Sequence, residues 1–413
     1  MKKIIYIFFI FMLMSVASYS LPECASEAYI CTLADSGQVL YEKNADRKLP
    51  IASLTKIMTA IVYLEKCDKS KPVIYTKEAS HTESACMFFP IGTKLTPDDA
   101  LRGMLIGSSN DLAVAIARST VGEETFVAYM NEKAQTIGMK NTHFANVHGL
   151  DDPNAYSTCE DMALLVRYAL RVPGFMDCIA PEYVIHADNK GKDFIRRVYS
   201  TFRNFYSFKG LKGIKTGTTS NAKKCFAGYT DRNSTPLVTI ILGSGDAIKD
   251  TRTLVNYTYS NCEKRTVAFR DRYYSVTYKG TKITINPQED VAVYMDRDRE
   301  PETKITVTEK FPFWKGKKVG ELIVTDNGRE IRRADFYSEK FILWPSVCTK
   351  ILKIVIIILV ILFILKIIMH NLNSRPRRRK PTLKALPHRP MPRHISRRQK
   401  EEKDRRSDRN RMR

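Results

Sequence analysis

Residues 49–60 read LPIASLTKIMTA, and they place a serine and a lysine three positions apart at the start of an apolar helix. Apolar residues recur at helical spacing through residue 66, so Ser53 and Lys56 lie one turn apart on one face. A serine hydroxyl needs a base in contact to act as a nucleophile, and a lysine of lowered pKa can be that base. Helix-start N–H groups would also face a developing oxyanion. Alone, S-x-x-K is equally typical of an ordinary helix start with a surface lysine.

Two further motifs follow in order along the chain. Ser108-Ser109-Asn110 is a short polar turn between two apolar helical stretches, where a hydroxyl and an amide can project into a cleft. Lys215-Thr216-Gly217-Thr218-Thr219 comes 107 residues after Ser108. A strand at this third motif would offer its edge to an extended peptide, and Lys215, Thr216 and Thr218 would face a carboxylate. Alone, Ser108-Ser109-Asn110 is typical of a helix cap, and the motif that begins at Lys215 is typical of a turn.

The three motifs in this order resemble the signature of the penicillin-recognising serine acyl-transferases. The chain resembles the low-molecular-mass penicillin-binding proteins, which are serine-type D-alanyl-D-alanine carboxypeptidases. The resemblance covers roughly residues 25–345. It also rests on the following segments: Met130-Asn131, Gly138-Met139, Thr142-His143-Phe144, His148-Gly149-Leu150-Asp151, Asp161-Met162-Ala163 and Gly320-Glu321-Leu322-Ile323-Val324. It implies an α/β (α+β) fold, with a β-lactamase/transpeptidase-like catalytic domain and a small all-β C-terminal domain.

The resemblance also implies a role for each motif residue in acyl transfer. Ser53 attacks the D-Ala-D-Ala carbonyl and becomes an acyl-enzyme, and Lys56 takes its proton. Ser108 and Lys215 relay a proton to the departing D-alanine, and water then releases the shortened peptide. The family needs no metal and no organic cofactor, and β-lactam antibiotics acylate it.

The substrate-binding roles implied by the resemblance fall on the second and third motifs. Asn110 binds the amide of the substrate, while Thr216 and Thr218 hold the terminal carboxylate together with Lys215. The backbone N–H groups of Ser53 and Thr218 form the oxyanion hole. We expect a structural role for His148.

The sequence departs from the family pattern near the third motif. Lys223 and Lys224 stand where members usually carry a glycine and an apolar residue before the cysteine, here Cys225, and we expect them to alter the rim of the cleft. Ser109 replaces the usual glycine of the second motif. The family usually ends in an amphipathic surface helix, whereas a membrane-spanning helix, interrupted only by Lys353 and Lys366, and a basic tail are expected here.

Both ends of the chain predict a membrane protein. Residues 1–20 combine Lys2 and Lys3 with an apolar stretch and small residues before a cut after Ser20, which is typical of a secretory signal peptide. The 19 residues of 351–369 would rise about 28 Å as a helix, close to the thickness of a hydrocarbon core. Basic residues follow at once, which predicts a single-pass protein of the bacterial cell membrane, with a cytoplasmic tail and an extracytoplasmic catalytic domain.

The net charge of +23 does not indicate a nucleic-acid-binding protein. Residues 370–413 hold 17 basic and 4 acidic residues, so more than half of the excess lies in this tail. The tail is rich in Pro and Arg, and we expect it to be disordered and to contact anionic lipids of the inner leaflet. No nucleic-acid partner is expected, because no recognisable nucleic-acid module lies beside it.

The sequence predicts five parts: a signal peptide (1–20), the catalytic domain (21–262), a small β-sandwich (263–345), the transmembrane helix (346–369) and the basic tail (370–413). In the catalytic domain we expect a hairpin of residues 29–33 and 39–41, helices near 51–66, 96–106, 112–118, 124–137, 157–170 and 248–260, and strands at 226–229 and 237–242. In the small domain we expect strands near 273–278, 281–285, 291–294, 305–307 and 321–324. Nine scattered cysteines form no CxxC pair and no zinc-type spacing, and their pairing cannot be read.

Three alternative functions share these motifs. A β-lactamase would need a deacylating glutamate, usually as E-x-x-x-N, and no such spacing occurs between Ser119 and Leu211. A DD-endopeptidase that cuts cross-links uses the same chemistry. A non-catalytic scaffold that binds the cell wall would not need every catalytic side chain, and all of them are present.

Overall fold

The computed structural model describes residues 22–202, 208–342 and 345–373, and the chain divides into two compact units, Met1–Trp344 and Pro345–Arg413. The predicted signal peptide therefore lies outside the described residues, as does nearly all of the basic tail. Of the nine cysteines, the eight whose side chains are described are free thiols.

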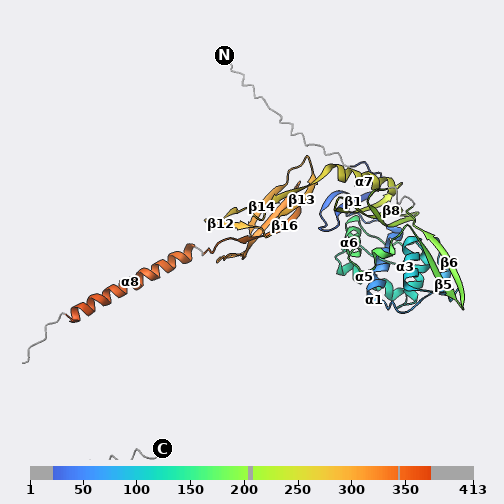
Figure 1. Cartoon of the computed structure of the whole chain (residues 1–413), viewed down its shortest axis with the longest axis horizontal. Helices are drawn as coiled ribbons and strands as arrows, with labels where there is room; N and C mark the ends of the chain where they lie inside the picture. The colour runs from blue at the N-terminus through green and yellow to red at the C-terminus, as the bar shows by residue number, and fades with distance from the viewer. Residues whose placement is uncertain (1–21, 203–207, 343–344, 374–413) are drawn as a thin grey trace, which may run out of the picture. The chain divides into compact units, whose positions relative to one another are not determined.

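A five-stranded antiparallel sheet forms the centre of the catalytic part (Figure 1). Its order is β2-β1-β9-β8-β7, so β7 is an edge strand. The strands are β1 (Ala28–Leu33), β2 (Val39–Lys43), β7 (Leu211–Thr219), β8 (Lys223–Arg232) and β9 (Thr235–Ser244). The expected hairpin at the N-terminus is confirmed as β1 and β2, and the expected strand of the third motif is confirmed as β7.

Apolar cores cover both faces of this sheet. Ile30 and Ile240 pair across β1 and β9 and face one core, while the adjacent pair, Tyr29 and Ile241, faces the other. Successive side chains of a strand point to opposite faces, so a strand buried on both sides carries a nearly continuous apolar run, as residues 237–242 do apart from Thr239. Helix α7 (Ala247–Asn261) contributes Leu254 to the second core.

The remaining helices pack on the first face, and α3 to α6 pack directly on α1 (Thr55–Lys66). They are α2 (Lys77–Ser80), α3 (Pro97–Ile106), α4 (Asn110–Arg118), α5 (Glu123–Thr136) and α6 (Cys159–Ala169), with the 3₁₀ turns η1 (Ala52–Leu54) and η2 (Met176–Cys178). The predicted helices are all present. Capping explains two of the starts, because the hydroxyl of Thr96 accepts from Asp99 N and that of Thr158 accepts from Asp161 N.

A four-stranded sheet of order β3-β4-β5-β6 was not predicted. It contains β3 (Val73–Ile74), β4 (Lys94–Leu95), β5 (Glu182–Asn189) and β6 (Lys192–Tyr199). The hairpin of β5 and β6 turns at Lys190-Gly191, where both residues have positive φ. Such a turn is a hairpin signal that the sequence did contain. Most of the hairpin's side chains are exposed or half-buried, so it lacks a strong apolar pattern.

The C-terminal part of the first unit is all-β. Strands β10 (Cys262–Ala268) and β13 (Val291–Asp296) pair, and β11 (Tyr274–Tyr278), β12 (Thr281–Asn286), β16 (Arg329–Ser338), β15 (Lys318–Asp326) and β14 (Glu302–Val307) form a second sheet in that order. Phe313, Phe336 and Val293 belong to its separate core. The five predicted strands are confirmed. β10 and β16 were missed because charged residues interrupt their alternation.

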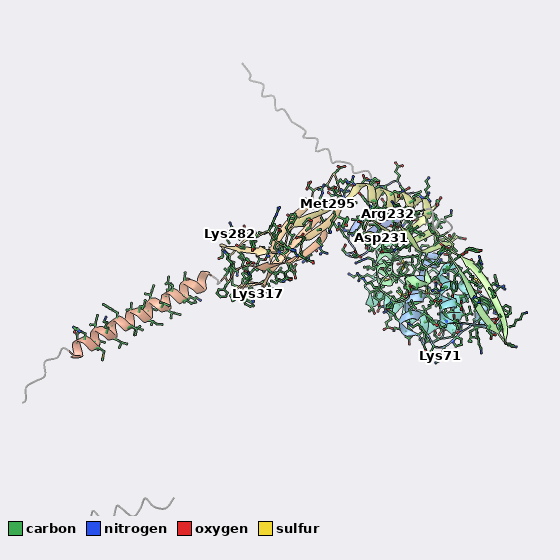
Figure 2. The ribbon with its side chains drawn as sticks, in the orientation of Figure 1. Lys71, Asp231, Arg232, Lys282, Met295 and Lys317 are labelled. Atoms are coloured by element: carbon green, nitrogen blue, oxygen red, sulfur yellow. The ribbon has the colours of Figure 1, made fainter. Side chains whose placement is uncertain are left out.

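The second unit contains one long helix, α8 (Pro345–Asn373). Residues Thr349–Asn371 are long and apolar enough to cross a membrane by length and composition. Its described side chains project outward around the helix, and the apolar ones are exposed (Figure 2). A helix that is apolar all round is typical of a lipid or core environment.

Candidate active site

Ser53 lies in the 3₁₀ turn η1, directly before α1. The preceding residue, Ala52, has a φ of 48°, a left-handed conformation that a non-glycine residue seldom adopts. Thr55 supports this bend, because its hydroxyl donates to Ala52 O at 2.9 Å. Ser53 is half-buried, whereas residues 54–63 are buried. The turn thus brings the serine hydroxyl to the surface end of a helix that is otherwise core.

Lys56 is fully buried, and its amine contacts three groups. Nζ lies 2.9 Å from Ser53 Oγ, 2.6 Å from Asn110 Oδ1 and 2.6 Å from His148 O. Burial lowers the lysine pKa well below its ordinary value, and the charge of Lys215 lowers it further. A neutral amine has two N–H groups and one lone pair. The two carbonyl oxygens can accept its N–H groups, which leaves the lone pair for the Ser53 proton.

The second motif forms the expected turn between two helices. Ser108 has a φ of 59°, Ser109 caps α4, and Asn110 is the first residue of that helix. Asn110 bridges the site, because Oδ1 accepts from Lys56 and Nδ2 donates to Glu83 O at 2.9 Å. Ser108 lines the same cavity as Ser53. Within the described ranges, no hydrogen bond joins Ser108 Oγ to Lys56 or Lys215.

The residues of the third motif alternate between buried and more exposed positions along the edge strand β7. Lys215 is buried, and its Nζ donates to Thr216 O at 2.9 Å. Burial lowers the pKa of Lys215 to about 7. Thr216 is half-buried and Thr218 is exposed, and both line the cavity. The hydroxyl of Thr216 also contacts the hydroxyl of Thr201.

Two glycines allow other segments to pack closely on the turn that carries Ser53. A Cβ on Gly217 would lie 3.0 Å from Ile51 O and 3.1 Å from Ser53 N, so β7 packs directly on the nucleophile turn. Gly149 has a φ of 88°, and a Cβ there would lie 2.0 Å from Ala52 O. Only glycine fits the approach at Gly149, whereas an alanine at position 217 would require a small shift of β7.

The resulting cavity has a volume of about 390 Å³ and is open to solvent. It brings together five of the seven predicted site residues, and Lys56 and Lys215 lie buried beside it. Its lining comprises Ser53, Ser84, Ala85, Ser108, Asn110, Gly149, Leu150, Thr201, Thr216, Gly217, Thr218, Thr219, Lys224, Cys225, Asp246, Ala247 and Ile248.

The structure adds residues that sequence reasoning did not assign to the site. Asp151 holds β7, because its carboxylate accepts from Thr219 Oγ1 at 2.6 Å and from Asn221 N at 3.3 Å. Asp111 is fully buried and accepts from Tyr75 OH at 2.8 Å and from Met87 N at 2.7 Å. Asp111 directly follows Asn110, and Asp151 directly follows the HGL triplet of 148–150. This adjacency to the motifs is the feature of the sequence that could have indicated both residues.

His148 positions the site through its backbone rather than its ring. Its carbonyl accepts from Lys56, and its ring Nδ1 accepts from Leu150 N at 3.1 Å. Burial and the neighbouring Lys56 lower the His148 pKa to about 4. The ring is therefore neutral near pH 7, which agrees with the expected structural role.

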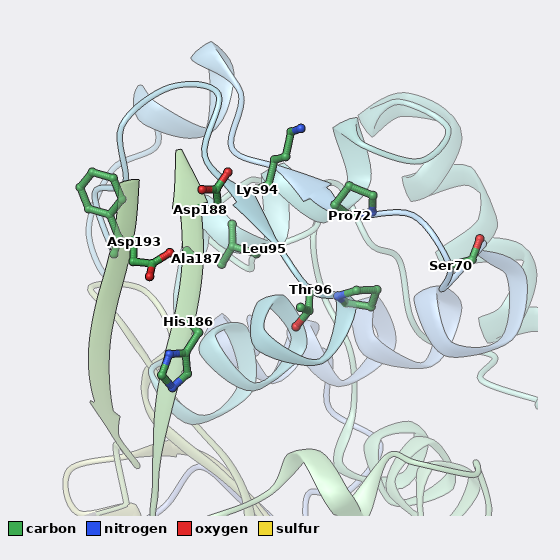
Figure 3. Close-up of a pocket in the computed structure, with 11 residues that line it drawn as sticks. Ser70, Pro72, Lys94, Leu95, Thr96, His186, Ala187, Asp188 and Asp193 are labelled. Atoms are coloured by element: carbon green, nitrogen blue, oxygen red, sulfur yellow. The ribbon is translucent and has the colours of Figure 1, made fainter. Parts of the chain in front are cut away.

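A second cavity of about 430 Å³ lies beside β4, β5 and β6 (Figure 3). Lys94, His186, Asp188 and Asp193 line it, and Figure 3 shows them spread along the strands rather than gathered at one point. None of the predicted site residues belongs to this lining. Among the described residues that line this second cavity, no serine contacts a lysine. The cavity at Ser53 is therefore the candidate active site.

The hydroxyl of Ser53 contacts the buried amine of Lys56, beside β7, the edge strand of a sheet that is covered on both faces. This arrangement is typical of the active-serine acyl-transferases. The model of the family Peptidase_S11, D-alanyl-D-alanine carboxypeptidase, matches residues 15–246, and the chain belongs to this family. The matched range contains all three motifs.

Individual relatives agree with this placement. The D-alanyl-D-alanine carboxypeptidase DacF of Bacillus subtilis is 29% identical over 326 residues, which cover 74% of this chain and 83% of the relative. The D-alanyl-D-alanine endopeptidase of Pseudomonas aeruginosa is 30% identical over 225 residues, covering 53% and 72%. The crystal structure of the D-alanyl-D-alanine carboxypeptidase DacD from Francisella tularensis shares the fold with a TM-score of 0.66 at 21% identity, and it covers 79% of this chain and 95% of that one. The predicted fold class, a mixed α/β catalytic part followed by an all-β part, is confirmed.

Proposed function

We propose that this protein is a serine-type carboxypeptidase that removes the terminal D-alanine from peptidoglycan pentapeptides in cell-wall metabolism. The observation that carries the proposal is the 2.9 Å contact between Ser53 Oγ and the buried Lys56 amine, at the wall of a cavity bounded by β7. Family membership supports the substrate class. β-Lactam antibiotics, which acylate the same class of serine, are the expected inhibitors.

Acylation follows from the geometry of the two catalytic side chains. Ser53 Oγ attacks the carbonyl carbon of the penultimate D-alanine while its proton passes to Lys56 Nζ. The negative charge that forms on the carbonyl oxygen is bound by the N–H groups of Ser53 and Thr218. The close packing of Gly217 on Ser53 N supports this pairing of donors.

Departure of D-alanine requires a proton on its nitrogen when the C–N bond breaks. Lys56 now holds a proton, and Ser108, which faces the same cavity, can pass one on from Lys56 or Lys215. Asn110 binds the substrate amide through its Nδ2 group, and Thr216 and Thr218 bind the carboxylate with Lys215. Water then attacks the acyl-enzyme ester, the Ser53 oxygen regains a proton, and the tetrapeptide leaves.

The protein's location is proposed from its two ends. Residues 1–20 act as a signal peptide, 21–262 and 263–345 form the catalytic and β domains outside the cytoplasm, and 346–369 cross the membrane. The apolar, outward-facing side chains of α8 support the anchor. The basic tail of 370–413 then lies in the cytoplasm against anionic lipids.

The test uses the full chain in membranes with a pentapeptide muropeptide and a fluorescent penicillin. The unaltered protein should release free D-alanine and become labelled, and Ser53→Ala should abolish both. Ser220→Ala, an exposed serine five residues beyond Lys215, is the matched control and should retain both. Penicillin labelling that survives in Ser53→Ala would refute the assignment of the nucleophile.

The second candidate function is a DD-endopeptidase that cuts cross-links. It is favoured by the similarity to the endopeptidase of Pseudomonas aeruginosa, which matches over the same catalytic part. A purified cross-linked dimer muropeptide separates the two reactions. Conversion of the dimer to monomers, with no D-alanine released from pentapeptide, would establish the endopeptidase.

A further inference from the structure

Lys224 is a departure from the family pattern that the proposed mechanism does not use. In the ladder of β7 and β8, Lys224 lies directly opposite Thr218, and Lys223 lies opposite Thr219. Residues directly opposite in an antiparallel pair share one face of the sheet, with Cβ atoms about 4.5–5.5 Å apart. Thr218 and Lys224 are both exposed, and both line the active-site cavity. The Lys224 side chain therefore lines the cavity next to the residue expected to bind the substrate carboxylate.

The ammonium group of Lys224 has no carboxylate within ion-pair distance in the described part of the chain. The acidic residue in the cavity lining is Asp246, whose Oδ1 caps α7 by accepting from Lys249 N at 3.2 Å. The neighbouring Lys223, whose φ is 55°, pairs instead with Glu27 at 2.8 Å. Lys223 thus forms an ion pair within the fold, whereas Lys224 lines the cavity without an ion-pair partner among the residues that the structure describes.

The proposed substrate carries a negative charge where this cation lies. A pentapeptide ends in a free carboxylate, one residue beyond the bond that Ser53 attacks. Thr216 and Thr218 offer only neutral hydroxyl donors. Lys215 already donates to Thr216 O, and because its pKa is about 7 it is only partly charged at neutral pH. Lys224 is exposed at the cavity, and a hydrogen bond between an ammonium group and a carboxylate is stronger than one between neutral groups.

We propose that Lys224 is a specificity-determining residue that pairs with the free carboxylate of the amino acid released by cleavage. The inference rests on the proposed function, since it assigns a residue to the substrate of that same site. It predicts a preference for leaving groups that carry a carboxylate on the carbon next to the scissile nitrogen. Terminal D-alanine meets this requirement, and a cross-link through an unbranched side-chain amine does not.

The test compares Lys224→Met with the matched control Lys223→Met in the full-length protein. The substrates are an N-acylated peptide ending in D-Ala-D-Ala and the same peptide with a C-terminal amide. We expect Lys224→Met to lower kcat/KM on the acid roughly tenfold, mainly through KM, the size of a charged hydrogen bond that is partly screened. Activity on the amide should not change. Lys224→Arg should retain activity on the acid, and Lys223→Met should behave like the unaltered protein on both substrates.

Equal loss on acid and amide would overturn the proposal, because it would indicate a change in the fold of β8 rather than a lost charge pair. No loss on either substrate would overturn it as well. A second measurement keeps the inference separate from the proposed function. If the unaltered protein releases no D-alanine but is acylated by benzylpenicillin, the proposed function fails. Lys224→Met should then still slow acylation by benzylpenicillin and not by its methyl ester, and equal rates would refute the role of Lys224.

Discussion

Replacing Gly217 with alanine tests whether the contact between β7 and the nucleophile turn controls the reaction. Gly217 has no positive φ, so the substitution strains no backbone angle. The new Cβ would lie 3.0 Å from Ala52 Cβ, 3.0 Å from Ile51 O and 3.1 Å from Ser53 N. Because two of these atoms belong to the backbone, β7 must move outward by about 0.4–0.5 Å to restore ordinary contacts.

The size of the effect follows from that displacement. A misplacement of about 1 Å in an active site can cost roughly 100-fold in rate, so half of that distance should cost about tenfold. Overpacking typically costs about 1–3 kcal/mol of stability. We therefore expect Gly217→Ala to remain folded at 25 °C while it loses about tenfold in the rate of penicillin acylation and of D-alanine release.

The assay is stopped-time labelling with a fluorescent penicillin, followed by thermal unfolding of the same sample. Gly245→Ala is the matched control, because a Cβ there meets nothing within 4 Å and the residue has no positive φ. It should label at the unaltered rate. Unchanged acylation in Gly217→Ala would refute the reasoning, since it would mean that the spacing between β7 and Ser53 does not set the oxyanion geometry.

Three further predictions follow from the site and from α8. The pKa of Lys215 is about 7 in the folded protein and 10.5 for an ordinary lysine. Between pH 7 and pH 10.5 the unfolded chain therefore binds more protons than the folded protein, and the free energy of unfolding should rise with pH in this range. Urea titrations should show Lys215→Met flattening that slope. Asp151→Ala removes the 2.6 Å contact to Thr219 and should slow acylation severalfold without unfolding the protein; unchanged kinetics would contradict this. Ending the chain at residue 344 should give active protein in the supernatant after ultracentrifugation; activity confined to the pellet would mean that the membrane anchor is not α8.

Local signals in the sequence were enough to predict most of the fold. Apolar residues at helical spacing predicted α1, and the sequence also predicted helices near 96–106 and 157–170, where the structure has α3 and α6. Such signals depend on residues within a few positions of one another. The hairpin of β5 and β6 has a turn signal but little apolar alternation, because much of its surface is exposed. Its pairing with β4 is a long-range contact that no local pattern encodes.

The sequence by itself determined which residue types could carry the chemistry, through three motifs in a fixed order. Only the tertiary structure decided how they meet. The Lys56 amine contacts Asn110, 54 residues away, and His148, 92 residues away, and burial rather than sequence spacing lowers its pKa. Likewise, the register of β7 and β8 decides that Lys224 faces the cavity while Lys223 pairs with Glu27. The physical reason is that successive side chains of a strand point to opposite faces, so the register of a pair of strands decides which side chains reach a cavity at its edge.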